Sequence, residues 1–165
     1  DSSLEDLLLA KRYDPKNARI FLYLGQLYAK LDQLEAATEA TLQALDLRAG
    51  YSDAYSLLSE IYVKQQKYAD AIAALDNALE NTRYRRERFY VKRAAVYMTT
   101  GEPKLALNDY ISARNDNPEN AVAWMGEFEA AIELDNRKVA GVALDEFVKL
   151  RPNDERIKTM RDKLK

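Results

Sequence analysis

The feature that most constrains this chain is a spacing of 34 residues that recurs along its length. Pro118 and Pro152 lie 34 residues apart. The same step, lengthened once to 35, separates successive members of a register of small side chains, Ala10, Ala44, Ala78 and Ala113. Such a period predicts a stack of similar supersecondary units, because a single unit cannot bury its apolar face alone.

Within one period the apolar side chains predict two helices separated by a short polar break. In residues 20–31 they fall at intervals of three and four, the spacing of one helix face. Asp32 and Gln33 interrupt this pattern, and a second amphipathic run extends from Leu34 to Leu45. β-branched residues are too few, and alternating patterns too rare, for a sheet. We therefore expect an all-α fold with nine to ten helices.

This helix–turn–helix period resembles the tetratricopeptide repeat, whose pattern is W-x2-L-G-x2-Y, then A-x3-F, then P. The residues at these positions in the four units are Phe21, Leu24, Gly25, Tyr28, Ala37 and Thr41; Tyr55, Leu58, Ser59, Tyr62, Ala71 and Leu75; Tyr90, Arg93, Ala94, Tyr97, Ala106, Tyr110 and Pro118; and Trp124, Glu127, Phe128, Ala131, Ala140, Leu144 and Pro152. The resemblance covers essentially the whole chain. It implies a right-handed superhelical solenoid of helix–turn–helix repeats.

The repeat register divides the chain, taken as a single domain, into four full units with a helix at each end. The expected segments are 1–17 as an orphan second helix, 18–51, 52–86, 87–120 and 121–154 as repeats, and 155–165 as a capping helix. One extra residue falls between the second and third units, near residues 81–86. A polar outer face on the last helix suits the end of a solenoid.

Three residues depart from the family pattern. Arg93 and Glu127 stand where it requires an apolar side chain, and Thr41 replaces a large apolar one. We expect the third and fourth repeats to pack less ideally, or these two charges to reach the rim.

Composition excludes several classes of function. The chain has no Cys and no His, which removes disulfides, thiol nucleophiles, imidazole bases and the usual zinc ligands. Lys and Arg number 25 against 27 Asp and Glu, and this near balance argues against a nucleic-acid binder. No apolar stretch approaches the ~20 residues of a membrane span. We predict no cofactor, no metal, no nucleic-acid partner and no membrane insertion; a cytoplasmic and a bacterial periplasmic location are both compatible.

Carboxylates are the remaining candidates for catalysis. Glu129 and Glu133 are four residues apart on one helix face, with Asp135 nearby. A general acid or base needs burial or a close like charge to tune its pKa. The pattern favours a solvated acidic face, and we predict that the protein is not an enzyme.

The densest charge cluster is the basic stretch Arg83, Arg85, Arg86, Arg88, Lys92 and Arg93, interleaved with Tyr84, Phe89 and Tyr90. Basic residues beside aromatic ones can grip phosphate and stack on bases. Tyr90 occupies a packing position of the repeat, however, and we expect Phe89 to close the lengthened loop. The stretch is interpreted as a solvated loop or, alternatively, as an anchor for an acidic partner segment.

The family resemblance implies that the first helices of the repeats line a concave surface on which partners lie. The candidate partner-binding residues on this surface are Leu22, Gln26, Arg88, Val91, Lys92, Met98, Val122, Met125, Glu129, Ile132 and Glu133. Only Arg88 and Lys92 match the carboxylate clamp of chaperone-binding relatives, so we do not expect that clamp. The surface becomes apolar toward the C-terminal half, where Met suits an adaptable site; alternatively, these residues pack between hairpins.

We therefore predict a protein–protein interaction scaffold that holds a peptide or segment of a protein partner. The alternative is a spacer or assembly segment of a larger repeat protein, with an empty groove. The orphan first helix favours this alternative, since something should cover its open side. Leu4, Leu7, Leu8 and Leu9 cannot all face one side of a helix, and self-association through this helix is possible.

Overall fold

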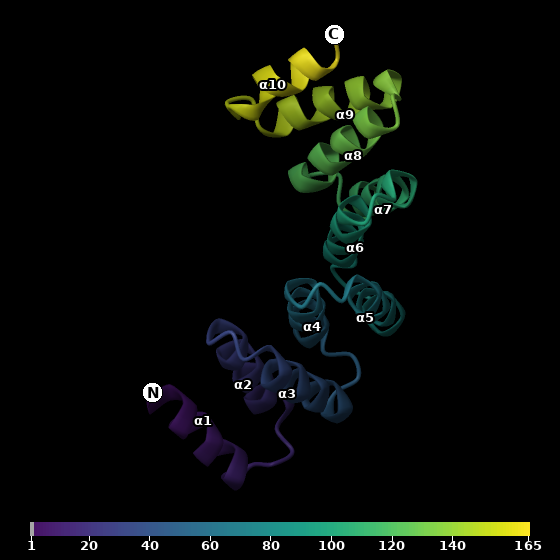
Figure 1. Ribbon diagram of the computed structural model, residues 1–165. Coiled ribbons are helices and arrows are strands. Elements are labelled where there is room, and N and C mark those ends of the chain that lie inside the picture. Colours follow the sequence, from purple (N-terminus) through teal and green to yellow (C-terminus); the bar gives the residue numbers. More distant parts are fainter. Residues whose placement is uncertain (1) are drawn as a thin grey trace. The chain divides into compact units, whose positions relative to one another are not determined.

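The computed structural model describes residues 2–165, and Asp1 of the expected 1–17 segment lies outside the described residues. The described part is all-α and contains ten helices and no strand, which confirms the predicted fold class (Figure 1). The helices are α1 (Ser2–Tyr13), α2 (Ala18–Lys30), α3 (Leu34–Leu47), α4 (Ser52–Lys64), α5 (Tyr68–Asn81), α6 (Glu87–Thr99), α7 (Pro103–Asp116), α8 (Ala121–Glu133), α9 (Arg137–Leu150) and α10 (Arg156–Lys163).

Local sequence signals mark several helix starts. Asn17 precedes α2 and Asn120 precedes α8, and each side-chain oxygen accepts a hydrogen bond from a backbone N–H of the first turn. Asn136 caps α9 in the same way. Pro103 is the first residue of α7, where its missing N–H costs no helical hydrogen bond.

The four helical hairpins α2–α3, α4–α5, α6–α7 and α8–α9 share one turn. In each, the fifteenth residue of the repeat has a positive φ; these residues are Asp32, Gln66, Gly101 and Asp135. The N–H of the following residue returns to a carbonyl five residues earlier, as Gln33 does to Tyr28 and Glu102 to Tyr97. This is the Schellman pairing, which satisfies carbonyls at the helix end and needs one left-handed residue.

The register of small side chains lies where helices touch. Ala44, Ala78 and Ala113 are fully buried, as the sequence predicts. No larger side chain fits between backbones that approach this closely.

The chain divides into two compact units, one up to Tyr84 and one from Arg85 to Lys165. The division falls between α5 and α6, in the segment that carries the extra residue of the repeat register. Arg85 in this segment has a φ of 55°.

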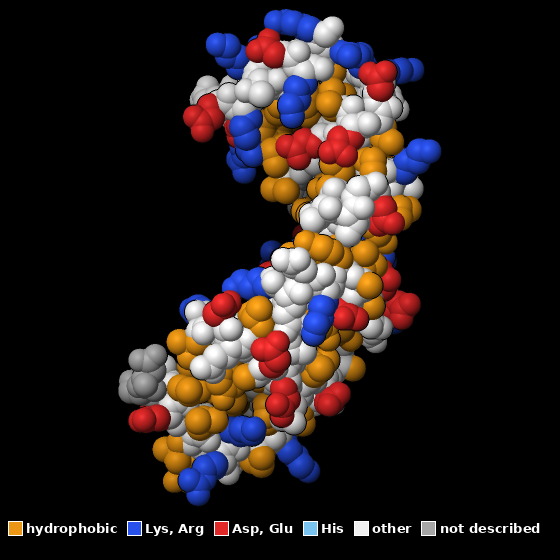
Figure 2. All heavy atoms as spheres, in the orientation of Figure 1, with side chains coloured by type: hydrophobic (Ala, Val, Ile, Leu, Met, Phe, Trp, Pro, Cys, Tyr) orange, Lys and Arg blue, Asp and Glu red, His pale blue; other side chains and the backbone are white. Residues whose placement is uncertain are grey.

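The core of the first unit is built from α2, α3, α4 and α5, and Leu75 of α5 is fully buried in it. Phe21 and Leu22 of α2 pack with Ala44 and Ala54, and Ile61 of α4 packs beside the turn between α2 and α3. Helix α1 lies against α2. Its Leu9 is 49% exposed, as the sequence predicts for part of the leucine run, whereas Leu8, 39% exposed, lines a small hollow with Phe21 of α2. Figure 2 shows hydrophobic side chains among charged ones over the region of α1 and α2.

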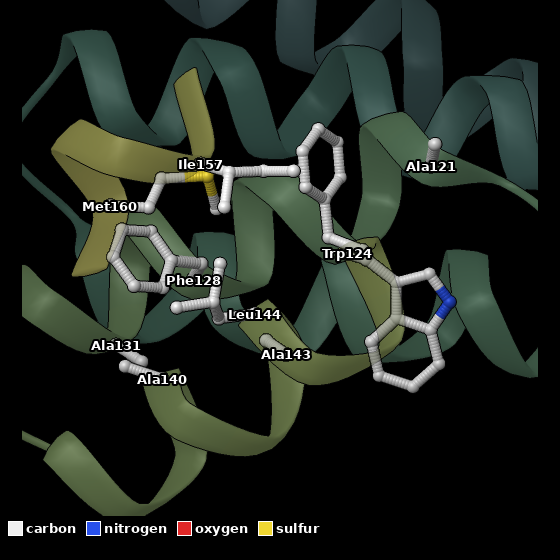
Figure 3. Packing of buried hydrophobic residues seen from close by; sticks show 10 residues of the cluster. Ala121, Trp124, Phe128, Ala131, Ala140, Ala143, Leu144, Ile157 and Met160 are labelled. Atoms are coloured by element: carbon white, nitrogen blue, oxygen red, sulfur yellow. The ribbon is translucent and has the colours of Figure 1, made fainter. Parts of the chain in front are cut away.

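The second unit closes on an aromatic core. Trp124 and Phe128 of α8 pack with Leu144 and Phe147 of α9. Ile157 and Met160 bring the last helix onto this cluster, and Ala131 lies beside Ala140 near the α8–α9 turn (Figure 3). α10 thus covers the apolar side of the fourth repeat with two residues, while its other side chains are mostly exposed.

The charges that depart from the family pattern do not reach the rim, so that alternative of the sequence prediction is wrong. Arg93 of α6 binds Asp109 of α7 through two hydrogen bonds of 2.7 Å. Glu127 of α8 is buried and accepts a hydrogen bond from Arg114 of α7. Both charges are neutralised by α7, one on each side of that helix.

Thr41 is explained by its neighbour on α2. A Cβ added to Gly25 would clash with the Thr41 hydroxyl oxygen, so α2 approaches Thr41 closely because it has glycine at this position. The Thr41 hydroxyl donates to the Ala37 carbonyl at 2.7 Å, which satisfies it inside the core.

Candidate partner-binding surfaces

The first unit carries a groove between the first helices of its two repeats, α2 and α4. It encloses a volume of about 560 Å³. Its lining consists of Gln26, Ala29 and Lys30 from α2 and Asp53, Ser56, Leu57, Glu60, Ile61 and Lys64 from α4. The helix pitch brings these residues to one face, since they recur at intervals of three and four.

The groove combines charged groups of both signs with the apolar side chains of Ala29, Leu57 and Ile61. Asp53 and Glu60 supply carboxylates, and Lys30 and Lys64 supply ammonium groups. The Lys64 ammonium also donates to the Ala29 carbonyl at 3.4 Å, which joins the two helices at one end of the groove. Such a surface can pair with the amides and mixed charges of a polypeptide segment.

Of the predicted partner-binding residues in the first unit, one lies in this groove and one does not. Gln26 is exposed and lines it. Leu22 is 3% exposed and packs with Phe21 and Ala44, so its side chain is not accessible to a partner. The reason is that α4 packs against α2 and covers Leu22, the fifth residue of the first repeat. The sequence alone does not determine which residues of α2 this contact buries.

In the second unit the predicted apolar residues lie at the edges of the cores. Val91 and Met98 are half-buried against the cluster around Ala94 and Tyr110. Met125 and Ile132 are half-buried against the aromatic core of α8 and α9. Val122, at 52%, is the more exposed apolar position of this set.

The predicted flanking charges are accessible to differing degrees. Glu129 and Glu133 are exposed on α8, and Asp135 follows them in the turn, also exposed. Arg88 and Lys92 are partly buried on α6. The three carboxylates thus lie open to solvent.

The basic stretch before and within α6 separates into packed and solvated residues. Phe89 is fully buried, and the Arg86 guanidinium donates to the Tyr90 hydroxyl at 3.0 Å while lying over its ring. Tyr84 is exposed. The aromatic residues of this stretch therefore do not form one continuous stacking surface.

Burial strongly raises the pKa of one tyrosine, Tyr110. Tyr110 of α7 inserts against α8, where a Cβ added to Gly126 would clash with its ring. Desolvation, with smaller contributions from Glu129 and Asp109, raises the pKa of Tyr110 to about 12.

Sequence reasoning missed two arginines that belong to a second surface. Arg151 follows α9 and Arg156 begins α10, and both line a hollow with Val122 and Met125. They lie outside the first helices of the repeats, where the resemblance directs attention. The sequence around Pro152 mixes cations with the carboxylates Asp154 and Glu155, so it gives no clear signal for them.

The described residues form neither a membrane-spanning helix nor a metal site. None of their helices combines the length and apolarity needed to cross a membrane. No group of three or more Asp and Glu side chains among them is arranged to hold a metal ion.

A sequence profile described as tetratricopeptide repeat matches residues 18–51 and 52–83. The matched spans begin at the residues where α2 and α4 begin. Among curated proteins, the human protein O-mannosyl-transferase TMTC1 is 30% identical over 120 residues. That alignment covers 70% of this chain but 14% of the relative, so the chain corresponds to a small part of that protein.

Solved structures share the fold. MamA superposes with a TM-score of 0.80 at 21% identity, over 90% of this chain and 86% of MamA. PilF of Pseudomonas aeruginosa superposes with a TM-score of 0.83 at 18% identity, over 96% of this chain and 72% of PilF. At these identities the likeness concerns the arrangement of the helices.

Proposed function

Since this chain belongs to the tetratricopeptide repeat family, we propose that it acts as a protein–protein interaction scaffold. In this proposal an extended segment of a partner protein lies in the groove between α2 and α4. The observation that supports it is the groove itself, which is open, lined by both charged and apolar side chains, and built from the first helices of two adjacent repeats.

The groove chemistry suits a polypeptide. Gln26 and Ser56 can donate to and accept from the amides of an extended chain, and the carboxylates and ammonium groups can select its side chains. These residues sit on helices whose opposite faces are buried, so they are held in place before binding. A preorganised surface loses less entropy when a partner binds.

We propose a separate contact surface on the first helices of the second unit, α6 and α8. Met98, Met125 and Ile132 keep part of their surface accessible, and Val122 keeps more. Arg88 and Lys92 on α6, and Glu129 and Glu133 on α8, would set the orientation of a bound segment. In this role the half-buried residues both close the core and contact the partner.

We propose a binding role and no catalysis for this chain. The three carboxylates that were candidates for acid–base chemistry, Glu129, Glu133 and Asp135, are exposed. The mannosyl-transferase activity in the name of the human relative describes a protein of which this chain spans 14%.

A spacer or assembly role is the second candidate, and one observation favours it. Leu8, Leu9 and Tyr13 of α1 are exposed. Apolar side chains in such a position are suited to contact with a further helix or a second copy. In this alternative the groove between α2 and α4 stays empty.

The test blocks the groove without touching the core. Ser56→Trp places a large side chain in the groove, and Asn77→Trp places the same side chain on the exposed face of α5 as the control. Both proteins, checked for native helicity and melting temperature, are used as baits in extract of the source cells.

We expect partners captured by the wild-type and Asn77→Trp proteins to be depleted by Ser56→Trp. Equal capture by all three proteins would contradict the groove. Concentration-dependent dimerisation that Leu9→Glu abolishes, with no groove-dependent partner, would instead support the spacer role.

A further inference from the structure

We infer that the second unit carries a site for an acidic peptide, separate from the α2–α4 groove. This inference rests in part on the binding role proposed above for Arg88, Val122 and Met125. The arginines of the site would bind peptide carboxylates that flank one apolar side chain. The site is a hollow of about 400 Å³. The residues that define it are Arg85, Arg88, Arg151, Arg156, Val122 and Met125, and we call it the arginine hollow.

The arginines of the hollow come from separate parts of the chain. Arg85 precedes α6 and Arg88 lies in its first turn, while Arg151 follows the end of α9 and Arg156 begins α10. The lining holds these four cations against two carboxylates, Glu87 and Glu119, so an excess of positive charge is left to attract an anion. Guanidinium groups also match the geometry of carboxylates, to which they can donate two parallel hydrogen bonds.

Arg156 is held in place by its own neighbours. Its guanidinium makes hydrogen bonds of 2.6 and 2.8 Å to the two carboxylate oxygens of Asp154, and its Nη1 lies 2.7 Å from the Met125 sulfur. It also lies over the Phe147 ring, 5.5 Å from the centroid. This arginine is therefore fixed at the edge of the hollow and stacked on the apolar core.

The hollow has an apolar part that a simple anion would not need. Val122 is half-exposed beside the half-buried Met125, at the N-terminal end of α8. A methionine beside a fixed guanidinium adapts to several apolar shapes. In Figure 2 Lys and Arg side chains lie beside hydrophobic ones on the flank where Figure 1 places α10 and the start of α8.

The N-terminal end of α8 adds an electrostatic field that favours an anionic ligand. The Val122 and Ala123 N–H groups already donate to the Asn120 side chain, so they are not available to a ligand. This helix end therefore contributes only its dipole. The arginines are therefore expected to supply the hydrogen bonds to a ligand.

An acidic peptide fits these features better than a nucleic acid. Nucleic-acid surfaces use exposed aromatic side chains to stack bases, and the one aromatic residue in this lining, Phe147, is fully buried. The net charge of the chain, −2, gives no general attraction for polyanions.

The test measures binding of a fluorescein-labelled peptide, Asp-Glu-Leu-Glu-Asp, to the full chain by fluorescence anisotropy at physiological salt. Two control peptides are measured in the same way. In one, Lys replaces all four acidic residues, and in the other, Ser replaces the central Leu. We expect binding of the acidic peptide only, weakened several-fold by the Ser replacement and reduced by added salt.

Two variants address the hollow and one serves as control. Arg151→Glu reverses an exposed cation of the lining, and Val122→Asp places a charge on its apolar part. Arg161→Glu makes the same charge change on α10 outside the lining. We expect at least about a tenfold loss of affinity for the first two and less than about twofold for the control.

Equal loss in all three variants would show a general charge effect and overturn the site, as would absence of binding up to about 1 mM peptide. A labelled ten-nucleotide oligouridine that binds as tightly as the peptide would overturn the choice of ligand. Ser56→Trp should leave peptide affinity unchanged, so failure of the α2–α4 groove and failure of the arginine hollow are distinguishable.

Discussion

The Nε of Arg114 lies 2.5 Å from a carboxylate oxygen of Glu127, and this pair joins α7 to α8 inside the second unit. The Glu127 side chain is 3% exposed and that of Arg114 is 28% exposed. The same guanidinium lies 4.7 Å from the centroid of the Trp124 ring. The indole N–H of Trp124 in turn donates to the Pro118 carbonyl at 2.8 Å.

Breaking this pair from one side should be costly. Arg114→Met leaves the Glu127 carboxylate buried without its cation, and we expect the free energy of unfolding to fall by about 3 kcal/mol. The double variant Arg114→Met with Glu127→Leu should recover most of this loss, because no buried charge remains. Urea unfolding of both proteins measures the difference.

The control for the pair is Lys149→Met, which removes the exposed partner of Glu146 and should change stability by less than about 1 kcal/mol. A double variant as unstable as Arg114→Met would show that the loss comes from packing on Trp124 rather than from the unpaired charge.

Two glycine-to-alanine changes should have opposite effects. Gly101 has a φ of 78° in the third hairpin turn, so an alanine there loses about 1 kcal/mol or more to the left-handed conformation. Gly141 lies within α9, and no neighbouring atom stands within 4 Å of the position that a Cβ would take, so alanine should stabilise that helix by about 0.5–1 kcal/mol. Thermal melts of the two variants give the signs, and a gain in both would refute the turn argument.

Stability should fall in strong alkali through Tyr110. Its pKa is about 12 in the folded protein, against about 10 for a phenol in an unfolded chain. The folded state holds this proton more tightly, so its contribution is complete below pH 10 and is lost as pH rises toward 12. The loss is at most about 2–3 kcal/mol.

Tyr110→Phe keeps the ring against Gly126 and removes the ionisation. The difference in stability between this variant and the wild type should therefore change between about pH 10 and about pH 12 and be constant below. A difference that does not vary with pH would contradict the assignment to this residue.

The last helix should stabilise the fourth repeat through very few contacts. Met160→Ala removes a buried side chain from the aromatic core, and we expect a loss of about 2–3 kcal/mol. Thr159→Ala, at the neighbouring exposed position, is the matched control and should have little effect. Denaturant unfolding monitored by Trp124 fluorescence reports on both, and equal effects would argue against the capping role of α10.

The helices, their period and the buried alanines were predictable from the sequence because they depend on local spacing. Apolar residues at intervals of three and four define a helix face wherever they occur, and a small residue is required wherever two such faces approach closely. Ala44, Ala78 and Ala113 follow from the 34-residue step for this reason. The break between the two units also coincides with an irregularity of that step.

Only the tertiary structure decided which residues contact the side chains that depart from the repeat pattern, and which apolar residues of the first helices stay accessible. Arg93 and Glu127 look like exposed charges in the sequence, because their partners lie 16 and 13 residues away on α7. Leu22 and Val122 look alike as apolar positions on first helices, yet one is covered by a neighbouring helix and the other is open. Periodicity determines which face of a helix is apolar. Which residues meet across two helices depends on their crossing and rotation, and these are set by the whole core at once.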